Sequence, residues 1–312
     1  MKKVLLILMC CMAIQSVHAQ DTPKWADKAK KAVFSIVTYD KENKIKNTGN
    51  GFYIDNNGTA LSDYSLFEDA ERAVIINADG KELPVTRIAG ANSMYDVIKF
   101  RTETEKKITA LKVATQPAAV GETVYLLPYS TQKAATCQTG KVTQVDTIAD
   151  KAYYYTLTMT TSDKTVSCPI MNANGEVLGL IQKSASEEDK ESYAIGASYG
   201  ESLSISPLSA NDINLNKIGI AKALPETEDQ ALVYLYMSSS QMDAKNYLAT
   251  LNDFLQAYPN STEGYTRRAG YYMNIGDDEH NALAEADLKK AMDVSGNKTE
   301  GQYNVAKIIY SY

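Results

Sequence analysis

Histidine is nearly absent from this chain of 312 residues, which contains only two. His18 lies near the amino terminus and His280 in the carboxyl-terminal part, so the long stretch between them holds no imidazole. Histidine is the most frequent general base in enzymes that work near neutral pH, because its pKa lies in that range. Any chemistry in residues 32–205 must therefore proceed without this base.

Long hydrophobic runs are also missing, and none reaches the length that crosses a bilayer. The most apolar stretch, residues 4–14, follows Lys2 and Lys3 and precedes small residues that end at Ala19. This order of charge, short apolar run and small residues is typical of a secretory signal peptide. We predict a signal peptide over residues 1–19 and export to the periplasm or the exterior.

The chain has few cysteines, four in all, and two of them fall within the predicted signal. Cys10 or Cys11 could carry a lipid in an alternative lipoprotein interpretation, although Met9 before them fits such a cleavage site poorly. Cys137 and Cys168 remain after export to an oxidising compartment, where a disulfide between them is allowed. Two buried free thiols are the other interpretation.

Basic residues are outnumbered, 32 Lys and Arg against 38 Asp and Glu, which gives a net charge of −6. An acidic chain without a basic stripe cannot neutralise many phosphates, so we predict no nucleic-acid partner. No phosphate-binding or dinucleotide-binding glycine motif is present. The acidic runs 186–191 and 277–280 have mixed charge and lack the spacing of metal ligands, so we predict neither metal nor cofactor.

Short β-rich runs separated by turns fill residues 32–199. The run 33–39 is the first of about a dozen, and Asp55-Asn56-Asn57-Gly58 is a strong hairpin turn. No helical pattern connects successive runs, which favours antiparallel barrels or a sandwich over a parallel sheet.

A helical pattern begins after Pro225, where apolar residues recur at steps of three and four. The first such face contains Tyr247, Leu248, Leu251, Phe254, Leu255 and Tyr258. A second contains Tyr265, Ala269 and Tyr272 up to Gly276, and a third contains Ala284, Leu288 and Ala291.

The second and third faces together resemble a tetratricopeptide repeat, in which small residues let paired helices pack closely with a period of about 34 residues. In this comparison residues 277–283 form a longer turn than the family has, and residues 226–259 resemble a poorer copy. Residues 298–312 resemble one further helix. We expect these helices to lean on the β-rich part, and Tyr265 and Tyr272 to contact a partner.

The β-rich part resembles the protease domain of the trypsin-like HtrA/Deg family. The matching segments, in order, are Gly49-Asn50-Gly51-Phe52-Tyr53-Ile54, Tyr95-Asp96-Val97-Ile98, Val120-Gly121-Glu122-Thr123-Val124-Tyr125, Thr139-Gly140-Lys141-Val142 and residues 169–180. The resemblance implies a mostly β, trypsin-like double β-barrel followed by an all-α helical repeat domain. The implied boundaries are an N-terminal segment 20–31, barrels 32–205, a linker 206–225 and helical repeats 226–312.

Two of the three catalytic positions of that family are replaced. The family's Thr-Asn-x-His-Val stretch matches Ser62-Asp63-Tyr64-Ser65-Leu66, which places Ser65 at the histidine position. The stretch Gly-Asn-Ser-Gly-Gly-Pro matches residues 164–169, which places Val166 at the nucleophile position. Only the aspartate, Asp96, is kept, and we interpret it as a structural acid rather than a catalytic remnant. No catalytic site is intact.

The glycines of the oxyanion loop are replaced by Lys164, Ser167 and Cys168, whose Cβ atoms resist a positive φ. Ser167, after a shift of one residue, and Cys168 are the fallback nucleophiles. A thiolate at Cys168 would need a neighbouring cation, and Lys164 could act as a base only if it were desolvated.

The function that these residues favour is an exported pseudoprotease that binds peptides or proteins, or acts as a scaffold, in the cell envelope. The alternative is a divergent serine endopeptidase with an unusual catalytic site. The loss of the base depends on a count of histidines and is independent of any alignment.

Overall fold

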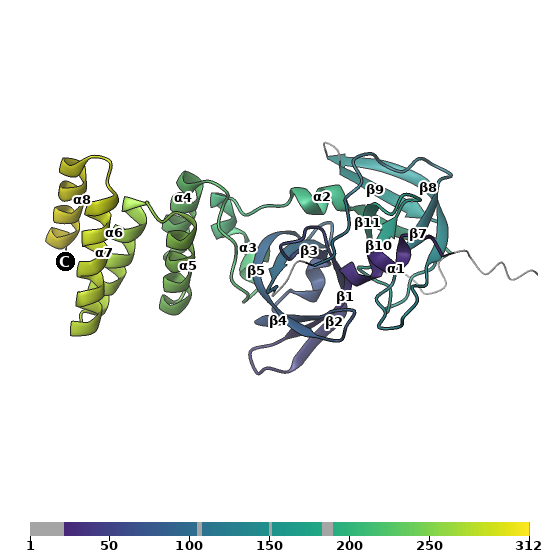
Figure 1. Ribbon diagram of the computed structural model, residues 1–312, viewed down its shortest axis with the longest axis horizontal. Helices are drawn as coiled ribbons and strands as arrows, with labels where there is room; N and C mark the ends of the chain where they lie inside the picture. The colour runs from purple at the N-terminus through teal and green to yellow at the C-terminus, as the bar shows by residue number, and fades with distance from the viewer. Residues whose placement is uncertain (1–21, 105–107, 150–151, 183–189, 312) are drawn as a thin grey trace, which may run out of the picture.

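The computed structural model describes residues 22–104, 108–149, 152–182 and 190–311. The molecule is elongated, with β-barrels at one end and helices at the other (Figure 1). The predicted signal peptide, with Cys10, Cys11 and His18, lies outside the described residues. No helix within these four ranges is long and apolar enough to cross a membrane.

The first barrel closes six antiparallel strands in the order β1-β2-β3-β6-β5-β4. The strands are β1 (Val33–Tyr39), β2 (Ile45–Tyr53), β3 (Thr59–Ser62), β4 (Arg72–Ile76), β5 (Glu82–Asn92) and β6 (Val97–Thr102). Alternate side chains point inward, and Phe34, Phe52 and Phe100 are fully buried. The predicted turn joins β2 to β3, where Gly58 has a φ of +94° that a side chain would strain.

The second barrel closes six more antiparallel strands in the order β10-β11-β12-β9-β8-β7. They are β7 (Thr123–Leu126), β8 (Gln138–Ala149), β9 (Ala152–Leu157), β10 (Pro169–Met171), β11 (Val177–Ile181) and β12 (Ser192–Gly196). Leu157, Leu180 and Ile195 are fully buried inside it. The double barrel predicted from the sequence is confirmed.

A short helical segment precedes β1 and packs against the second barrel. It consists of α1 (Ala26–Ala29) and the 3-10 helix η1 (Lys30–Ala32). The indole Nε1 of Trp25 donates a hydrogen bond of 3.0 Å to the carbonyl of Ala173, and its ring meets Tyr125 edge-on at 5.8 Å. Because the chain continues directly into β1 of the first barrel, this anchor holds the two barrels together.

The segment predicted as a linker is fixed to the first barrel. It follows α2 (Ala197–Ser202) and contains η3 (Pro207–Asn211) and α3 (Ile213–Asn216). Its extended end pairs with β5, since the N–H of Ile88 donates to Ala221 and the N–H of Ala223 donates to Ile88. The amino group of Lys222 donates to two carbonyls of its own segment, and burial lowers the pKa of Lys222 to about 8. This segment is therefore not a free tether.

Five helices form the carboxyl-terminal part: α4 (Glu228–Ser238), α5 (Ala244–Ala257), α6 (Thr262–Ile275), α7 (Asp278–Val294) and α8 (Lys298–Ser311). A side-chain oxygen caps the start of each of the first four, supplied by Thr227, Asp243, Ser261 and Asp277. The long turn expected over residues 277–283 is wrong. Helix α6 ends before Gly276, whose φ is +73°, and α7 begins directly after its cap, Asp277.

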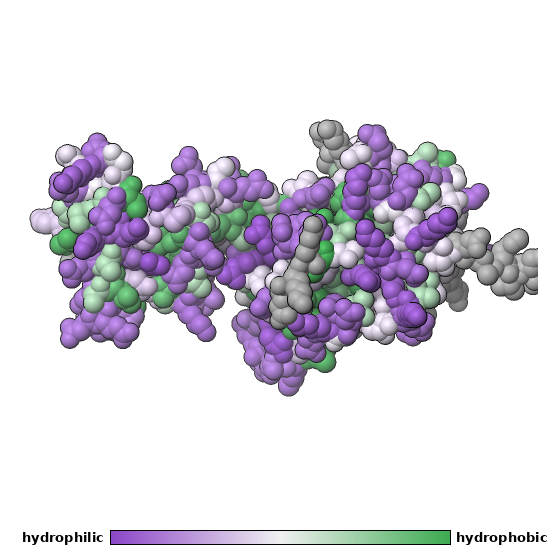
Figure 2. All heavy atoms as spheres, viewed as in Figure 1, coloured by the Kyte–Doolittle hydropathy of each residue, from purple (hydrophilic) through white to green (hydrophobic). Residues whose placement is uncertain are grey.

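The helices lean on the first barrel, as expected. Tyr234 of α4 is buried in the same hydrophobic cluster as the barrel cores. The guanidinium of Arg87 on β5 forms an ion pair with Asp253 of α5. On the face shown in Figure 2, hydrophobic residues occur in small patches among hydrophilic ones, which agrees with the placement of most large apolar side chains inside.

Candidate functional site

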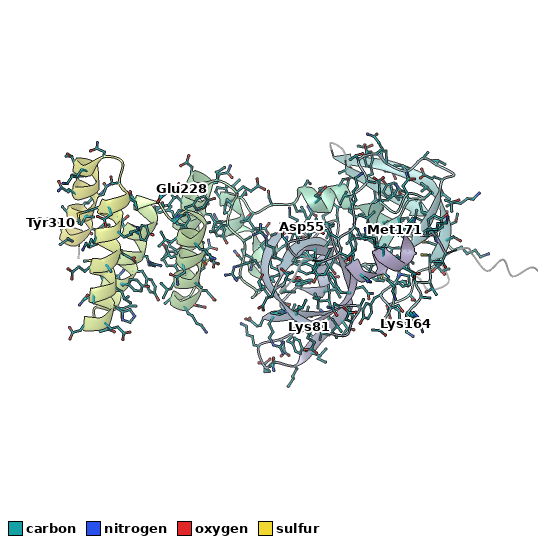
Figure 3. All side chains as sticks on the ribbon, viewed as in Figure 1. Asp55, Lys81, Lys164, Met171, Glu228 and Tyr310 are labelled. Atoms are coloured by element: carbon teal, nitrogen blue, oxygen red, sulfur yellow. The ribbon has the colours of Figure 1, made fainter. Side chains whose placement is uncertain are left out.

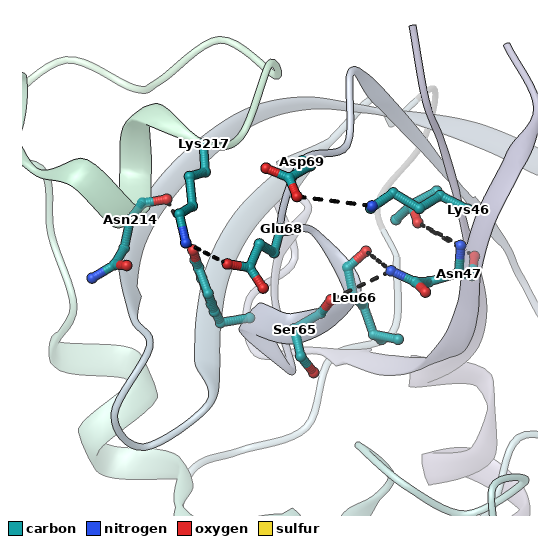
Figure 4. Close-up of polar contacts among 10 residues, drawn as sticks. Lys46, Asn47, Ser65, Leu66, Glu68, Asp69, Asn214 and Lys217 are labelled. Atoms are coloured by element: carbon teal, nitrogen blue, oxygen red, sulfur yellow. Dashed lines mark hydrogen bonds and ion pairs between the residues drawn. The ribbon is translucent and has the colours of Figure 1, made fainter. Parts of the chain in front are cut away.

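The turn that carries Ser65 is held rigidly at the end of β3. The 3-10 helix η2 (Tyr64–Leu66) begins there, and the amide of Asn47 donates to the carbonyls of Ser65 and Leu66 at 3.4 and 3.3 Å (Figure 4). An ion pair between Lys46 and Asp69 lies beside this contact. These contacts fix the backbone from which the side chain of Ser65 extends.

Asp96 reaches this turn from the loop between β5 and β6. Its Oδ1 accepts the backbone N–H of Ser65 at 2.7 Å, and its Oδ2 accepts the hydroxyl of Ser65 at 3.0 Å. Asp96 has a φ of +48°, which aspartate tolerates better than most residues. A serine hydroxyl stays protonated near neutral pH, so Ser65 does not replace the histidine of the family as a general base.

Val166 lies in a closed turn of the second barrel. Its N–H and that of Thr165 both donate to the carbonyl of Ser162, at 3.2 and 2.8 Å. From the first barrel, the amide of Asn50 donates to the carbonyls of Lys164 and Val166 at 3.1 and 2.9 Å. A side chain of one barrel thus pins the loop of the other, at the position where the resemblance places the nucleophile.

The match to known proteins fits this arrangement. Residues 49–180 match the family model of the trypsin-like peptidase domain. They make up less than half of the chain and extend from β2 to β11. The trypsin-like peptidase domain that the sequence motifs suggested is therefore supported over these residues.

A similar solved structure is the crystal structure of the serine endoprotease from Yersinia pestis, at 15% identity and a TM-score of 0.47. The similarity covers 56% of this chain and 61% of that chain, so it spans about three fifths of that protease's length. A comparison with curated proteins gives no match.

At position 166, where the resemblance places the nucleophile, the backbone N–H is not a free donor. Acyl transfer needs backbone N–H groups that point at the developing oxyanion. In this chain the N–H of Val166 is already bonded to Ser162. Lys164, labelled in Figure 3, is exposed, so it lacks the desolvation that would make its amine a base.

Ser167 and Cys168 are fully buried, with no exposed surface on either residue. Ser167 has a φ of +64°, the left-handed conformation that glycine adopts more readily. Strand-like hydrogen bonds hold both residues to Ile181. A substrate carbonyl has no access to either side chain in this structure.

Cys137 and Cys168, the two cysteines among the described residues, are free thiols with no disulfide between them. Burial raises the pKa of Cys168 to about 12 and that of half-buried Cys137 to about 11. The charge of Asp63 contributes a smaller part of this rise in the pKa of Cys168. Neither thiol is a nucleophile near neutral pH, because the thiolate is the reactive form.

We expect iodoacetamide at neutral pH to leave Cys168 of the folded protein unmodified, and to modify it readily after unfolding in urea. Peptide mapping by mass spectrometry distinguishes Cys168 from every other cysteine. Rapid modification of Cys168 in the folded protein would show an accessible thiolate, contrary to its burial.

Asp63 is the residue that sequence reasoning missed. It lies at the end of β3, is 3% exposed, and its Oδ1 has no hydrogen-bond partner. Burial raises the pKa of Asp63 well above its ordinary value, and the charge of Asp96 raises it further. The nearby hydroxyl of Ser167 acts in the opposite direction and lowers the pKa of Asp63, although its Oγ makes no well-formed hydrogen bond. The signal in the sequence was an aspartate where the HtrA/Deg stretch has a neutral asparagine.

A tyrosine-lined pocket of about 340 Å³ spans the two barrels beside this site. The amide of Gln182 donates to the carbonyl of Tyr95 at 2.7 Å, and its oxygen accepts the hydroxyl of Tyr154 at 2.6 Å. The ring of Tyr193 stacks on the ring of Tyr154, with ring centres 6.2 Å apart. Met94 lines the pocket and is 83% exposed. This is an aromatic surface open to solvent.

The two tyrosines chosen from the helical pattern do not line an open surface. Tyr272 is 9% exposed and packs in the core between α6 and α7, next to His280. The hydroxyl of Tyr265 donates to the carbonyl of Pro259 within the same helix pair. Their placement does not support the prediction that they contact a partner.

Residues 186–189 of the first acidic run lie outside the described residues, so the structure describes only the second run in full. Asp277 caps α7 and bonds to the backbone and ring of His280. No cluster of three metal-ligating side chains occurs among the described residues.

Proposed function

We propose that this chain is an exported pseudoprotease of the HtrA-like kind, which binds peptide or protein segments and does not cleave them. The missing base carries the proposal: neither barrel contains a histidine, and Ser65, at the histidine position that the resemblance gives, is hydrogen-bonded to Asp96. The resemblance also places Val166 at the nucleophile position.

The chemistry of serine proteases explains why this combination is inactive. The nucleophile and the base act as a unit, and removing either one costs about six orders of magnitude in rate. What remains in such enzymes, about 10³-fold over water, comes from the oxyanion pocket and binding. In this chain the Val166 N–H that would serve the pocket is also occupied. We therefore expect no useful peptidase activity.

The surface between the barrels supports binding. The trypsin-like domain keeps a pocket of about 340 Å³ lined by Tyr95, Tyr154 and Gln182. An extended peptide can bind beside such a cleft through its main chain, with an apolar side chain on the aromatic rings. A purely structural scaffold with a closed cleft would not need Met94 and Tyr193 exposed at this place.

The helical part fits tetratricopeptide-like repeats, which present binding surfaces. Helix α6 starts 34 residues after α4, and α7 starts 34 residues after α5. This spacing equals the period of about 34 residues in that family. Buried Ala269, Ala284 and Ala291 let α6 and α7 approach closely, which supports the assignment.

Export to the periplasm or the exterior is part of the proposal and depends on the signal-like pattern of residues 1–19. Mass spectrometry of the protein recovered from an exporting bacterial host would test it. We expect a mature chain that begins at Gln20. A full-length chain retained in the cytoplasm would contradict export.

The rival is a divergent endopeptidase that uses Ser167 or Cys168. We expect no labelling of the folded protein by a fluorophosphonate or by an epoxide that reacts with cysteine proteases, because both side chains are buried. Ser167→Ala and Cys168→Ala are the matched controls. Labelling that disappears in either variant would favour the peptidase.

A further inference from the structure

A groove of about 790 Å³ lies in the helical part and falls in the size range of ligand sites. Helices α4, α5, α6 and α8 line it, and the loop before α5 contributes Met242. Its lining includes Tyr236, Glu263, Arg267, Tyr271, Ile275 and Lys307.

The charges of the groove are biased toward the positive on an otherwise acidic protein. Arg267 and Lys307 line it, against a single carboxylate, Glu263, while the whole chain has a net charge of −6. Nη2 of Arg267 forms an ion pair with Oε1 of Glu263 at 2.9 Å, so the charge of this carboxylate is already paired. Lys307 is exposed on α8 and forms no ion pair with a residue that the structure describes. One cation in the groove thus remains uncompensated.

Arg267 also has an unused donor. Its side chain is 25% exposed, and its Nε is buried without a hydrogen-bond partner. A buried donor of a charged group without an acceptor is costly, by more than a neutral group would be. A ligand carboxylate in the groove would pair with the exposed part of the guanidinium, whose planar fork suits carboxylates.

Apolar and aromatic surface lies next to these cations. Tyr236 is 70% exposed, and the guanidinium of Arg267 lies 5.9 Å from the centre of its ring. Ile275 is 44% exposed, and Tyr271 faces Tyr247 with ring centres 6.3 Å apart. Exposed aromatic rings beside a cation are the usual composition of a protein-binding hot spot.

We propose that this groove binds an acidic peptide segment of another protein, with a carboxylate on Arg267 and Lys307 and an apolar side chain on Tyr236 and Ile275. The proposal deepens the proposed function, because it rests on peptide binding by this chain and names the chemistry of one ligand. Charge complementarity selects the occupant, since a basic groove attracts acidic segments and repels basic ones.

The test is fluorescence polarisation with the full chain and a short fluorescein-labelled peptide that alternates Glu with Leu and Phe. Two matched peptides replace every Glu with Gln or with Lys. We expect the acidic peptide to bind at least about tenfold more tightly than the Gln peptide, and the Lys peptide not to bind. Raising the salt from about 0.05 M to about 0.5 M should weaken binding, since the charges are partly exposed.

Variants then locate the site. Arg267→Gln should weaken binding about tenfold, and Lys307→Gln about threefold because Lys307 is exposed. Lys290→Gln, which removes the same charge from the exposed outer side of α7, should have no effect. Lys307→Gln keeps the test valid if Arg267→Gln fails to fold, which circular dichroism would show.

Equal affinity for the acidic and Gln peptides, or equal effects of the Lys307 and Lys290 substitutions, would overturn the proposal. If a second copy of this chain occupied the groove, the protein would elute as a dimer, and Lys307→Gln would dissociate that dimer. This result would also overturn the proposal. In both cases the barrels would still bind uncut polypeptide. Failure of the groove proposal is therefore distinguishable from failure of the proposed function.

Discussion

The Asp63→Asn protein is expected to melt at a higher temperature than the unsubstituted protein at pH 8, and at a similar temperature near pH 4. Asp63 is 3% exposed, beside Asp96 and the unpartnered hydroxyl of Ser167. A carboxylate in such a place has lost its water without gaining a cation. Asparagine has nearly the same shape and carries no charge to bury.

The sign follows from proton linkage. The pKa of Asp63 is raised in the folded protein, whereas an unfolded aspartate has a pKa of about 3.9. Between these two values the folded state holds more protons than the unfolded state, so stability falls as the pH rises. The loss is about 1.4 kcal/mol per pH unit inside that window, and it stops above the folded pKa.

Melting curves from about pH 4 to about pH 9 measure this slope, which Asp63→Asn should reduce. Asp79→Asn is the matched control, because Asp79 is exposed at a hairpin turn. An Asp63→Asn protein that keeps the original pH dependence would show that Asp63 does not titrate as its burial implies.

A loss of about 3 kcal/mol is expected when Asp287 is replaced by alanine, enough to loosen α6 and α7. Oδ2 and Oδ1 of Asp287 accept Nε and Nη2 of Arg268, each at 2.7 Å, in a bidentate pair. The side chain of Asp287 is 8% exposed, and that of Arg268 is 21% exposed. Removing the acid leaves a largely buried guanidinium without its partner, and the partial exposure keeps the cost at the lower end of the range for buried pairs.

The same Arg268 reaches a third helix, since its Nη1 donates to Asn252 of α5 at 2.8 Å. Hydrogen exchange of the α6 and α7 amides should therefore rise in Asp287→Ala while the barrel amides stay protected. Asp293→Ala, an exposed acid on the same helix, is the control. Similar exchange in both variants would mean that the Arg268–Asp287 pair contributes little to the stability of α6 and α7.

The sequence could predict most of the architecture because short-range patterns determine it. The run 33–39 became β1, and the turn at residues 55–58 became the β2–β3 hairpin, with Gly58 at positive φ. Motif order was also enough to place Ser65 and Asp96, which the structure brings within 3.0 Å. These features depend on local periodicity, turn chemistry and register.

Features that depend on packing between distant segments were not predictable. The role of Asp63 depends on burial between β3 and the Ser167 loop, which a linear pattern does not show. Partner contact by Tyr265 and Tyr272 stays a prediction, because a helical period alone does not show which rings of a helix are exposed. Only the way α4, α6 and α8 assemble decides which rings face the groove.

The main-chain pairing of the segment before Pro225 was missed for a similar reason. The segment lacks the alternation of a strand, yet its backbone joins β5 through Ile88. The predicted linker is consequently part of the first barrel's surface. The helices are positioned by it and by the ion pair between Arg87 and Asp253, so they are not freely suspended.

The central claim is binding without cleavage, and prolonged incubation of the purified protein with unfolded casein tests it most directly. Size exclusion reports complex formation, and electrophoresis of the same fractions reports the length of the casein. We predict that casein co-elutes with the protein and stays intact. Casein fragments that accumulate over time, and that no longer form when Ser167 or Val166 is substituted, would contradict the account.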